Sequence, residues 1–217
     1  MLTMSYLLHL DSSSLGAASV SRQVADSFRE AWTGEVVHRD LAASPVPHLS
    51  AAAVAAQHTD PAQHTAEQAA AAAVRDELVG EFLGASAYLF TVPMYNRTMP
   101  SVFKAWLDQV IIVGRTVIPS GTAPSAGRPA VLISARGGGY GPGTPNHGKD
   151  FLVPTLESVL GDPAYLGLDV TTLTPELTKA PVVPALAHLI PAHETSLANA
   201  HEQARVQAEK ISQQLVA

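Results

Sequence analysis

The order of apolar and polar segments along this chain predicts an α/β protein with a doubly wound, five-stranded parallel sheet and helices on both faces. Short apolar runs alternate with longer segments of helical spacing from residue 6 to residue 215. A strand–helix–strand order implies parallel pairing through right-handed crossovers. The 217 residues suffice for one sizeable core, and the sequence shows neither an internal repeat nor a linker. We therefore expect a single domain over residues 1–217.

The first half of the chain supplies three of these strands. Apolar runs end at polar or glycine-rich turns, and residues 19–32 place Val20, Val24, Phe28 and Trp32 on one helical face. Residues 42–68 are irregular and proline-containing, with short helices expected at 50–57 and from 62 onward. The expected elements are strands at 6–10, 35–41 and 85–92, and helices at 19–32 and 68–84.

The second half continues the alternation. Pro100 suits the first turn of a helix, and the Gly, Pro and Ser residues of 120–128 indicate an exposed loop. The expected elements are helices at 100–113, 149–160 and 194–215, strands at 129–135 and 168–173, and a glycine-rich loop at 137–149.

Composition excludes several classes of protein. With 47% hydrophobic and 15% charged residues the chain is globular, and its net charge of −6 disfavours nucleic acid or an anionic membrane as a partner. The absence of cysteine excludes disulfides, thiolate catalysis and cysteine-ligated metals. No leader is evident, and no run approaches the roughly 20 apolar residues of a membrane span. We expect a cytoplasmic protein, with Met4 as a second candidate start.

A serine-rich loop follows the first expected strand. Ser13 lies in the turn, Ser19 can cap the next helix, and Ser21 lies two residues into it. Hydroxyls and free backbone N–H groups at a helix start are donors for an anion such as a phosphate. The same serines would also suit an ordinary cap and a solvated turn.

Two further loops follow the third and fourth expected strands. Met94, Tyr95 and Asn96 offer soft apolar contact and an amide that both donates and accepts, which suits a flat ring with polar edges. The glycines at 137–139 allow a ligand to approach the backbone closely, and Tyr140 could flank a ring or only cover the core. Ordinary turns would explain either loop alone, but ligands in such sheets bind beyond the carboxyl ends of the strands.

With these loops in place, the chain resembles the FMN-dependent NADH azoreductase family of flavodoxin-like proteins. The resemblance rests on Leu10-Asp11-Ser12-Ser13 with Ser19-Val20-Ser21, on Pro93-Met94-Tyr95-Asn96, and on Ala135-Arg136-Gly137-Gly138. It implies a tightly bound FMN, with NADH or NADPH as co-substrate. It also implies a phosphate site at Ser13, Ser19 and Ser21, and contacts to the isoalloxazine ring from Met94, Tyr95, Asn96, Arg97, Ala135, Arg136, Gly137 and Gly138.

Two residues depart from the family pattern, since Arg97 stands where an aromatic residue is frequent and Ala135 where a hydroxyl residue is common. The resemblance further implies a homodimer with its active site at the subunit interface. The apolar face of the helix at 100–113 is a candidate dimer surface, although it would equally pack on its own sheet. That face consists of Phe103, Trp106, Leu107 and Val110.

The expected function is reduction of quinones, azo compounds or nitroaromatics by NAD(P)H, with ping-pong kinetics and no catalytic side chain. A flavodoxin-type electron carrier is the alternative function. A serine hydrolase using Ser12 or Ser13 with His193 is disfavoured, since no Gly-x-Ser-x-Gly elbow is present. The nine histidines lack metal-ligand spacing, so we expect them at exposed or loop positions.

Overall fold

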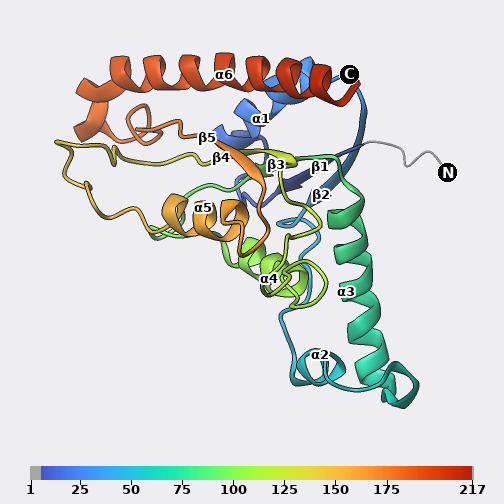
Figure 1. Ribbon diagram of the computed structural model, residues 1–217. Helices are drawn as coiled ribbons and strands as arrows, with labels where there is room; N and C mark the ends of the chain where they lie inside the picture. Colours follow the sequence, from blue (N-terminus) through green and yellow to red (C-terminus); the bar gives the residue numbers. More distant parts are fainter. Residues whose placement is uncertain (1–5, 217) are drawn as a thin grey trace.

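The sheet of this protein has five parallel strands in the order β2-β1-β3-β4-β5, as seen in a computed structural model that describes residues 6–216 (Figure 1). This confirms the doubly wound α/β prediction. Met4, the second candidate start, lies outside the described residues. The strands are β1 (Tyr6–Asp11), β2 (Glu35–Asp40), β3 (Ala87–Thr91), β4 (Pro129–Ile133) and β5 (Asp169–Leu173).

Helices cover both faces of the sheet. Helices α1 (Val20–Ala31) and α6 (Ile190–Val216) pack on one face, while α3 (Ala66–Gly84), α4 (Ser101–Val110) and α5 (Val153–Gly161) pack on the other (Figure 1). The short α2 (Ala51–Ala56) lies beside the end of α3 that projects from the body. Within residues 6–216, no helix combines the length and apolar composition needed to cross a membrane.

Alternation along the strands divides the core into two layers. Leu7 and Leu89 face α1 and α6, whereas Leu8, Leu10 and Phe90 face the α3–α4–α5 layer. The central strand β3 is buried along its whole length, while the edge strands β2 and β5 are partly exposed. This is the burial that a parallel sheet covered on both faces requires.

Side-chain caps set several boundaries differently from the sequence expectation. Helix α3 begins at Ala66 rather than at residue 68, because Thr65 and Gln68 form a reciprocal capping box. Helix α5 begins at Val153 rather than at residue 149, because the Asp150 carboxylate accepts the N–H groups of Leu152 and Val153 and closes a turn first. Short 3-10 helices occur at Gly16–Ala18, Pro61–Gln63 and Pro184–Leu189.

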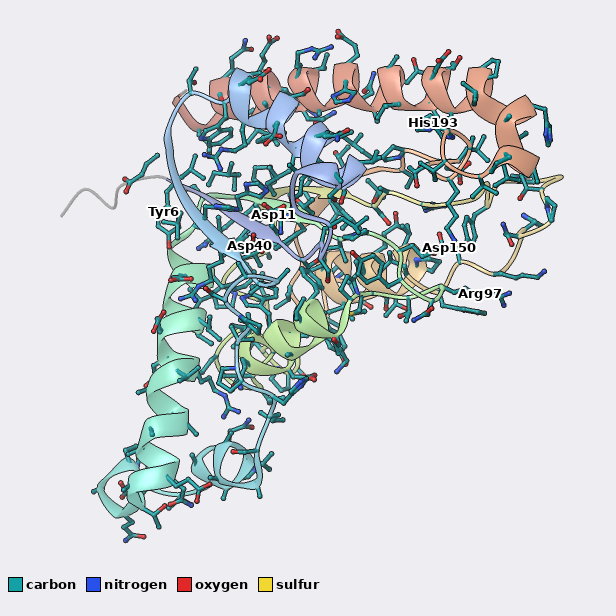
Figure 2. All side chains as sticks on the ribbon, turned by 180° about the vertical axis from the view of Figure 1, so that it is seen from behind. Tyr6, Asp11, Asp40, Arg97, Asp150 and His193 are labelled. Atoms are coloured by element: carbon teal, nitrogen blue, oxygen red, sulfur yellow. The ribbon has the colours of Figure 1, made fainter. Side chains whose placement is uncertain are left out.

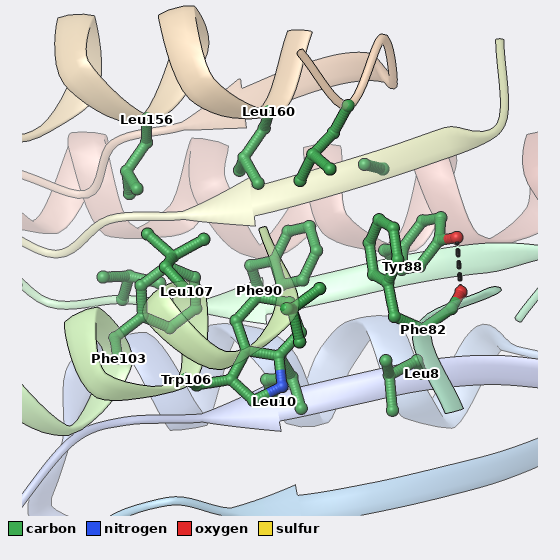
Figure 3. Close-up of a cluster of buried hydrophobic side chains, with 14 of the residues drawn as sticks. Leu8, Leu10, Phe82, Tyr88, Phe90, Phe103, Trp106, Leu107, Leu156 and Leu160 are labelled. Atoms are coloured by element: carbon green, nitrogen blue, oxygen red, sulfur yellow. Dashed lines mark hydrogen bonds between the residues drawn. The ribbon is translucent and has the colours of Figure 1, made fainter. Parts of the chain in front are cut away.

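The apolar face of α4 belongs to the core of its own chain. Phe103, Trp106, Leu107 and Val110 are at most 3% exposed and pack in the cluster shown in Figure 3. Trp106 lies within 6.1 Å of the Phe82, Phe90 and Phe103 rings, measured between ring centroids. This face is therefore not a dimer surface, because an amphipathic pattern shows which side is buried but not what buries it.

We predict that Phe103→Ala lowers the free energy of unfolding by about 3–5 kcal/mol, because a fully buried ring leaves a cavity that neighbouring side chains cannot fill. Phe151→Ala is the matched control, since Phe151 is 56% exposed, and its effect should stay within about 0.5 kcal/mol. Urea unfolding followed by tryptophan fluorescence measures both. Equal losses in the two variants would contradict the packing described.

Candidate functional site

The serine loop, residues 11–21, joins β1 to α1 at the carboxyl edge of the sheet. Ser19 caps α1 by accepting the N–H of Arg22 at 3.4 Å, and its hydroxyl lies 3.0 Å from that of Ser21. Within the described chain, the N–H groups of Gly16 and Ala17 have no acceptor. Hydroxyls and unpaired N–H groups therefore gather at the positive end of a helix, where an anion is favoured.

A tight turn follows β3. Tyr95 and Thr98 exchange backbone hydrogen bonds of 2.9 and 3.0 Å, and the residues between them adopt left-handed backbone angles, with φ of 50° at Asn96 and 70° at Arg97. Asparagine tolerates this conformation better than most residues, which accounts for Asn96, whereas Arg97 carries local strain. Asn96 and Arg97 are exposed, and both border the cavity described below.

The tyrosine of this turn connects it to the serine loop. The Tyr95 hydroxyl accepts the N–H of Ser14 at 3.0 Å and lies 3.3 Å from the Ser13 hydroxyl. Tyr95 also lines a cavity of about 560 Å³ beside the turn. Two of the three sequence-predicted loops are thus in direct contact.

A cavity of about 690 Å³ lies between this turn, the glycine-rich loop after β4 and the segment after β5. Its volume is typical of small-molecule sites, which span roughly 300–1,000 Å³. Leu177, Leu186 and Leu189 supply apolar wall, and Tyr140 also faces the cavity. Five sequence-predicted residues line it: Met94, Asn96, Arg97, Gly137 and Gly138.

Ala135 and Arg136 lie beneath this cavity rather than in its wall. Ala135 is 8% exposed, and its carbonyl accepts the N–H of Met94 at 2.9 Å. The guanidinium of Arg136, also buried, pairs with Asp150 at 2.9 Å and with Glu176 at 3.2 Å. Arg136 therefore ties the segment before α5 and the segment after β5 to the glycine-rich loop.

Two charged residues of the cavity wall were absent from the sequence hypotheses. Glu176 accepts the N–H of Tyr140 at 3.0 Å, and the Lys179 stem lies over Gly137, where an added Cβ would come within 2.9 Å of it. Both residues follow β5, and the carboxyl-end rule for parallel sheets would have pointed to that segment too.

A polar cluster with two buried members, His9 and Asp11, and the exposed His38 lies next to the serine loop on β1 and β2. His9 and His38 are register partners, and Asp11 shares their face, with ligand atoms within 4.8 Å of one another. Arginine can only donate, so the Arg29 guanidinium 3.1 Å from His9 Nδ1 requires that nitrogen to accept. The proton of neutral His9 is then on Nε2, 3.0 Å from the Thr91 hydroxyl, which disfavours metal ligation.

The cluster also sets the charge of its members. Burial lowers the pKa of His9 despite the nearby carboxylate. Burial alone would raise the pKa of Asp11, but the hydrogen bond from His38, the nearby His9 ring and the charge of Arg22 hold that pKa well below its ordinary value. The expectation of exposed or loop histidines is wrong for His9, which is 3% exposed within a strand, and for His193, which is 6% exposed within α6.

The structure gives no support to a serine hydrolase. The Ser12 hydroxyl donates to the Thr91 carbonyl at 2.8 Å, and the Ser13 hydroxyl contacts Tyr95. His193 Nδ1 instead lies 3.1 Å from the carbonyl of Glu176, after β5. Within residues 6–216, neither serine is paired with a histidine base, which that chemistry requires.

The fold and the loops at its carboxyl edge define a class of protein. The family profile described as "Flavodoxin-like fold" matches residues 5–215. An FMN-dependent NADH:quinone oxidoreductase of Streptomyces coelicolor is 46% identical over 99% of this chain and 98% of its own length. One from Frankia casuarinae is 44% identical over 94% of this chain and 99% of its own length. The chain therefore belongs to the flavodoxin-like family that includes these oxidoreductases.

Solved structures agree on the fold. An azoreductase from Bacillus anthracis str. Sterne superposes with a TM-score of 0.80 at 24% identity, covering 95% of this chain and 100% of that one. An FMN-dependent NADH-azoreductase from Bacillus anthracis str. Ames Ancestor, in complex with FMN, gives a TM-score of 0.79 at 20% identity, covering 96% and 100%.

We predict that Arg136→Ala lowers the free energy of unfolding by about 3–5 kcal/mol, because it leaves two acidic partners beneath the cavity without their cation. Arg205→Ala is the control, because Arg205 and its partner Glu202 are 45% and 62% exposed; such pairs contribute about 0–1 kcal/mol. Chemical denaturation measures both. A loss no larger in Arg136→Ala than in Arg205→Ala would contradict the bracing role.

The depressed pKa of His9 predicts a pH dependence. The unfolded chain takes up a proton near the ordinary histidine pKa of about 6.5, whereas the folded chain resists it, so stability is lost as pH falls below that value. Denaturation between about pH 7.5 and pH 5 should show this decline. His9→Gln should make it shallower, while the control His58→Gln, at an exposed position, should not. If the stability of His9→Gln falls with decreasing pH as steeply as that of the wild type, His9 is not the source of the decline.

Proposed function

We propose that this protein is an FMN-dependent oxidoreductase that uses NADH to reduce quinones or azo compounds. One observation carries the proposal. Loops after β1, β3 and β4 meet at one sheet edge, where the first presents anion donors and the other two border a cavity of about 690 Å³. The relatives that match nearly the whole chain are named for the same activity, which supports the proposal.

The donor set fits the phosphate of FMN. Ser13, Ser19 and Ser21 would hold it with their hydroxyls, together with the N–H groups of Gly16 and Ala17, which lack acceptors in the described chain. No lysine is needed at this position, because the helix start itself supplies positive potential.

The cavity fits the flavin ring. Within the described residues, the N–H groups of Gly137 and Gly138 have no acceptor, and the Asn96 amide faces the same space. These groups would bind the polar edges of the ring, while Met94 would contact its surface. Arg97 completes this set at the cavity wall.

Tyr95, Ala135 and Arg136 would act differently from those five residues. The hydroxyl of Tyr95 faces the serine loop, so this side chain would span the phosphate and ring ends of the site. Ala135 and Arg136 are buried below the cavity and would support the ring site through the backbone.

When bound, the flavin would accept a hydride from the nicotinamide and pass reducing equivalents to the second substrate. The protein would bind and orient the cofactor, and its N–H donors and Arg97 would stabilise negative charge at the cavity. One cavity would serve nicotinamide and acceptor in turn, which is ping-pong kinetics. No side chain is assigned as a nucleophile or general base.

The proposal extends to the organisation of the protein. We infer that residues 1–217 act as one FMN-binding domain, that the protein is cytoplasmic, and that it forms a homodimer through a surface other than the buried face of α4. Light scattering of the purified protein gives its molar mass and so tests the homodimer.

We predict that the purified protein is yellow, or becomes yellow with FMN, and that NADH bleaches the flavin absorbance without oxygen. Menadione should then restore the colour without any partner protein, because the cavity admits a small acceptor directly. Steady-state rates at varied NADH and menadione should give parallel double-reciprocal lines. A protein that stays colourless after incubation with FMN would refute the proposal, and bleaching without reoxidation by menadione would favour an electron carrier.

A further inference from the structure

Arg22 connects three segments around the serine loop. It is the third residue of α1 and directly follows Ser21. Its guanidinium donates to the carbonyl of Ser13 at 2.8 Å and bidentately to the Asp40 carboxylate at 2.7 and 2.8 Å. Its backbone N–H donates to the Ser19 hydroxyl. We call the side chain of Arg22 and its acceptors, the Ser13 carbonyl and Asp40, the Arg22 clamp.

The anchor of this clamp is itself fixed. Asp40 ends β2, and its Oδ1 also accepts the N–H groups of Ala42 and Ala43 at 3.0 and 3.1 Å. The hydrogen bond from Arg22 lowers the pKa of Asp40, so the pair is ionised around neutral pH. Bidentate guanidinium–carboxylate pairs fix orientation as well as distance. Figure 2 shows Asp40 near Asp11, at the ends of neighbouring strands.

The clamp determines which way the peptide after Ser13 faces. The C=O and N–H of a trans peptide point in opposite directions. Holding the Ser13 carbonyl on Arg22 therefore turns the N–H of Ser14 to the other side, where it meets the Tyr95 hydroxyl at 3.0 Å. The loop thus presents donors on the side facing the turn after β3 and directs its acceptor away from it.

The clamp also balances the charges beneath the loop. Asp11 Oδ2 lies 3.6 Å from the Arg22 guanidinium, and Asp40 is bonded to it directly. Without Arg22, two carboxylates would lie beside a site for an anion. The Arg22 guanidinium is bonded to these acids and to a carbonyl. By neutralising the two carboxylates it favours an anion in the serine loop without contacting that anion.

We propose that Arg22 is a positioning residue for the cofactor phosphate, acting through the Ser13 carbonyl and Asp40 rather than by binding the phosphate itself. This inference rests on the proposed function, since it assigns the serine loop to the phosphate of FMN. It differs from a general structural role in one respect: the clamp acts on the phosphate end of the ligand and not on the cavity for the ring.

Comparing FMN with riboflavin, which has the same ring without the phosphate, tests this distinction. The full-length protein and its variants are titrated with each flavin, and flavin fluorescence gives the two dissociation constants. Arg22→Gln should weaken FMN binding by about 10- to 100-fold, the effect of losing charge-assisted hydrogen bonds, and should change riboflavin binding less than about twofold. Added inorganic phosphate should compete with FMN less effectively in this variant.

Four further variants complete the test. Arg22→Lys retains the charge without the bidentate pair and should give an intermediate loss. Asp40→Asn should cause the same selective loss, and the double variant should not add to it, because both residues act through one contact. Arg39→Gln is the matched control, since Arg39 pairs with Glu77 and Glu81 on α3, away from the serine loop.

The outcomes separate the inference from the proposed function. If Arg22→Gln and Arg22→Lys lose equal affinity for FMN and riboflavin, or lose affinity for neither, the proposed role of the clamp is wrong. The proposed flavin site would stand in either case. Unaltered FMN binding in Asp40→Asn would likewise show that the proposed role of the clamp is wrong. A wild-type protein that binds neither flavin would overturn the proposed function and the clamp together. Circular dichroism of each variant confirms that the comparison is made on folded protein.

Discussion

Parallel pairing is the constraint on which the rest of this molecule depends. Because all five strands run the same way, their carboxyl ends lie along one edge, and the register aligns Asp11 with Thr91 and Thr91 with Ile133. Loops far apart in the sequence therefore begin side by side in space. The arrangement holds only because helices cover both faces of the sheet, which removes the central strands from water.

The charged residues near this edge hold loops in place, and they do not form a surface patch of one charge sign. Arg22 bonds the carbonyl of Ser13 and Asp40, and Arg136 pairs with two acids beneath the glycine-rich loop. Each guanidinium is neutralised by carboxylates from another segment. An acidic protein can in this way form a site for an anionic ligand from hydroxyls and backbone N–H groups, which need no net positive charge.

The features that could be predicted from the sequence are those that local residue patterns encode, namely the strands, the helices and the loops between them. Alternating apolar runs gave the sheet, and the three loops followed from the rule that ligands bind beyond the strand ends. The ion pairs of Arg22 with Asp40 and of Arg136 with Glu176 left no such signal, since their partners are 18 and 40 residues apart. The apolar face of α4 was visible in its spacing, but only the structure shows that Phe82 and Phe90 cover Trp106.

Helix α3 has consequences for local motion. Its second half is held by Leu78, Val79 and Phe82 in the core, whereas residues 66–73, mostly alanine, project beside α2 with little burial. Intrinsic helix propensity and the capping box at Thr65 are the main supports of that first part. Amide protons there should exchange with deuterated solvent through local opening, well before those of the core half, and the helix should fray from its start without disturbing the sheet.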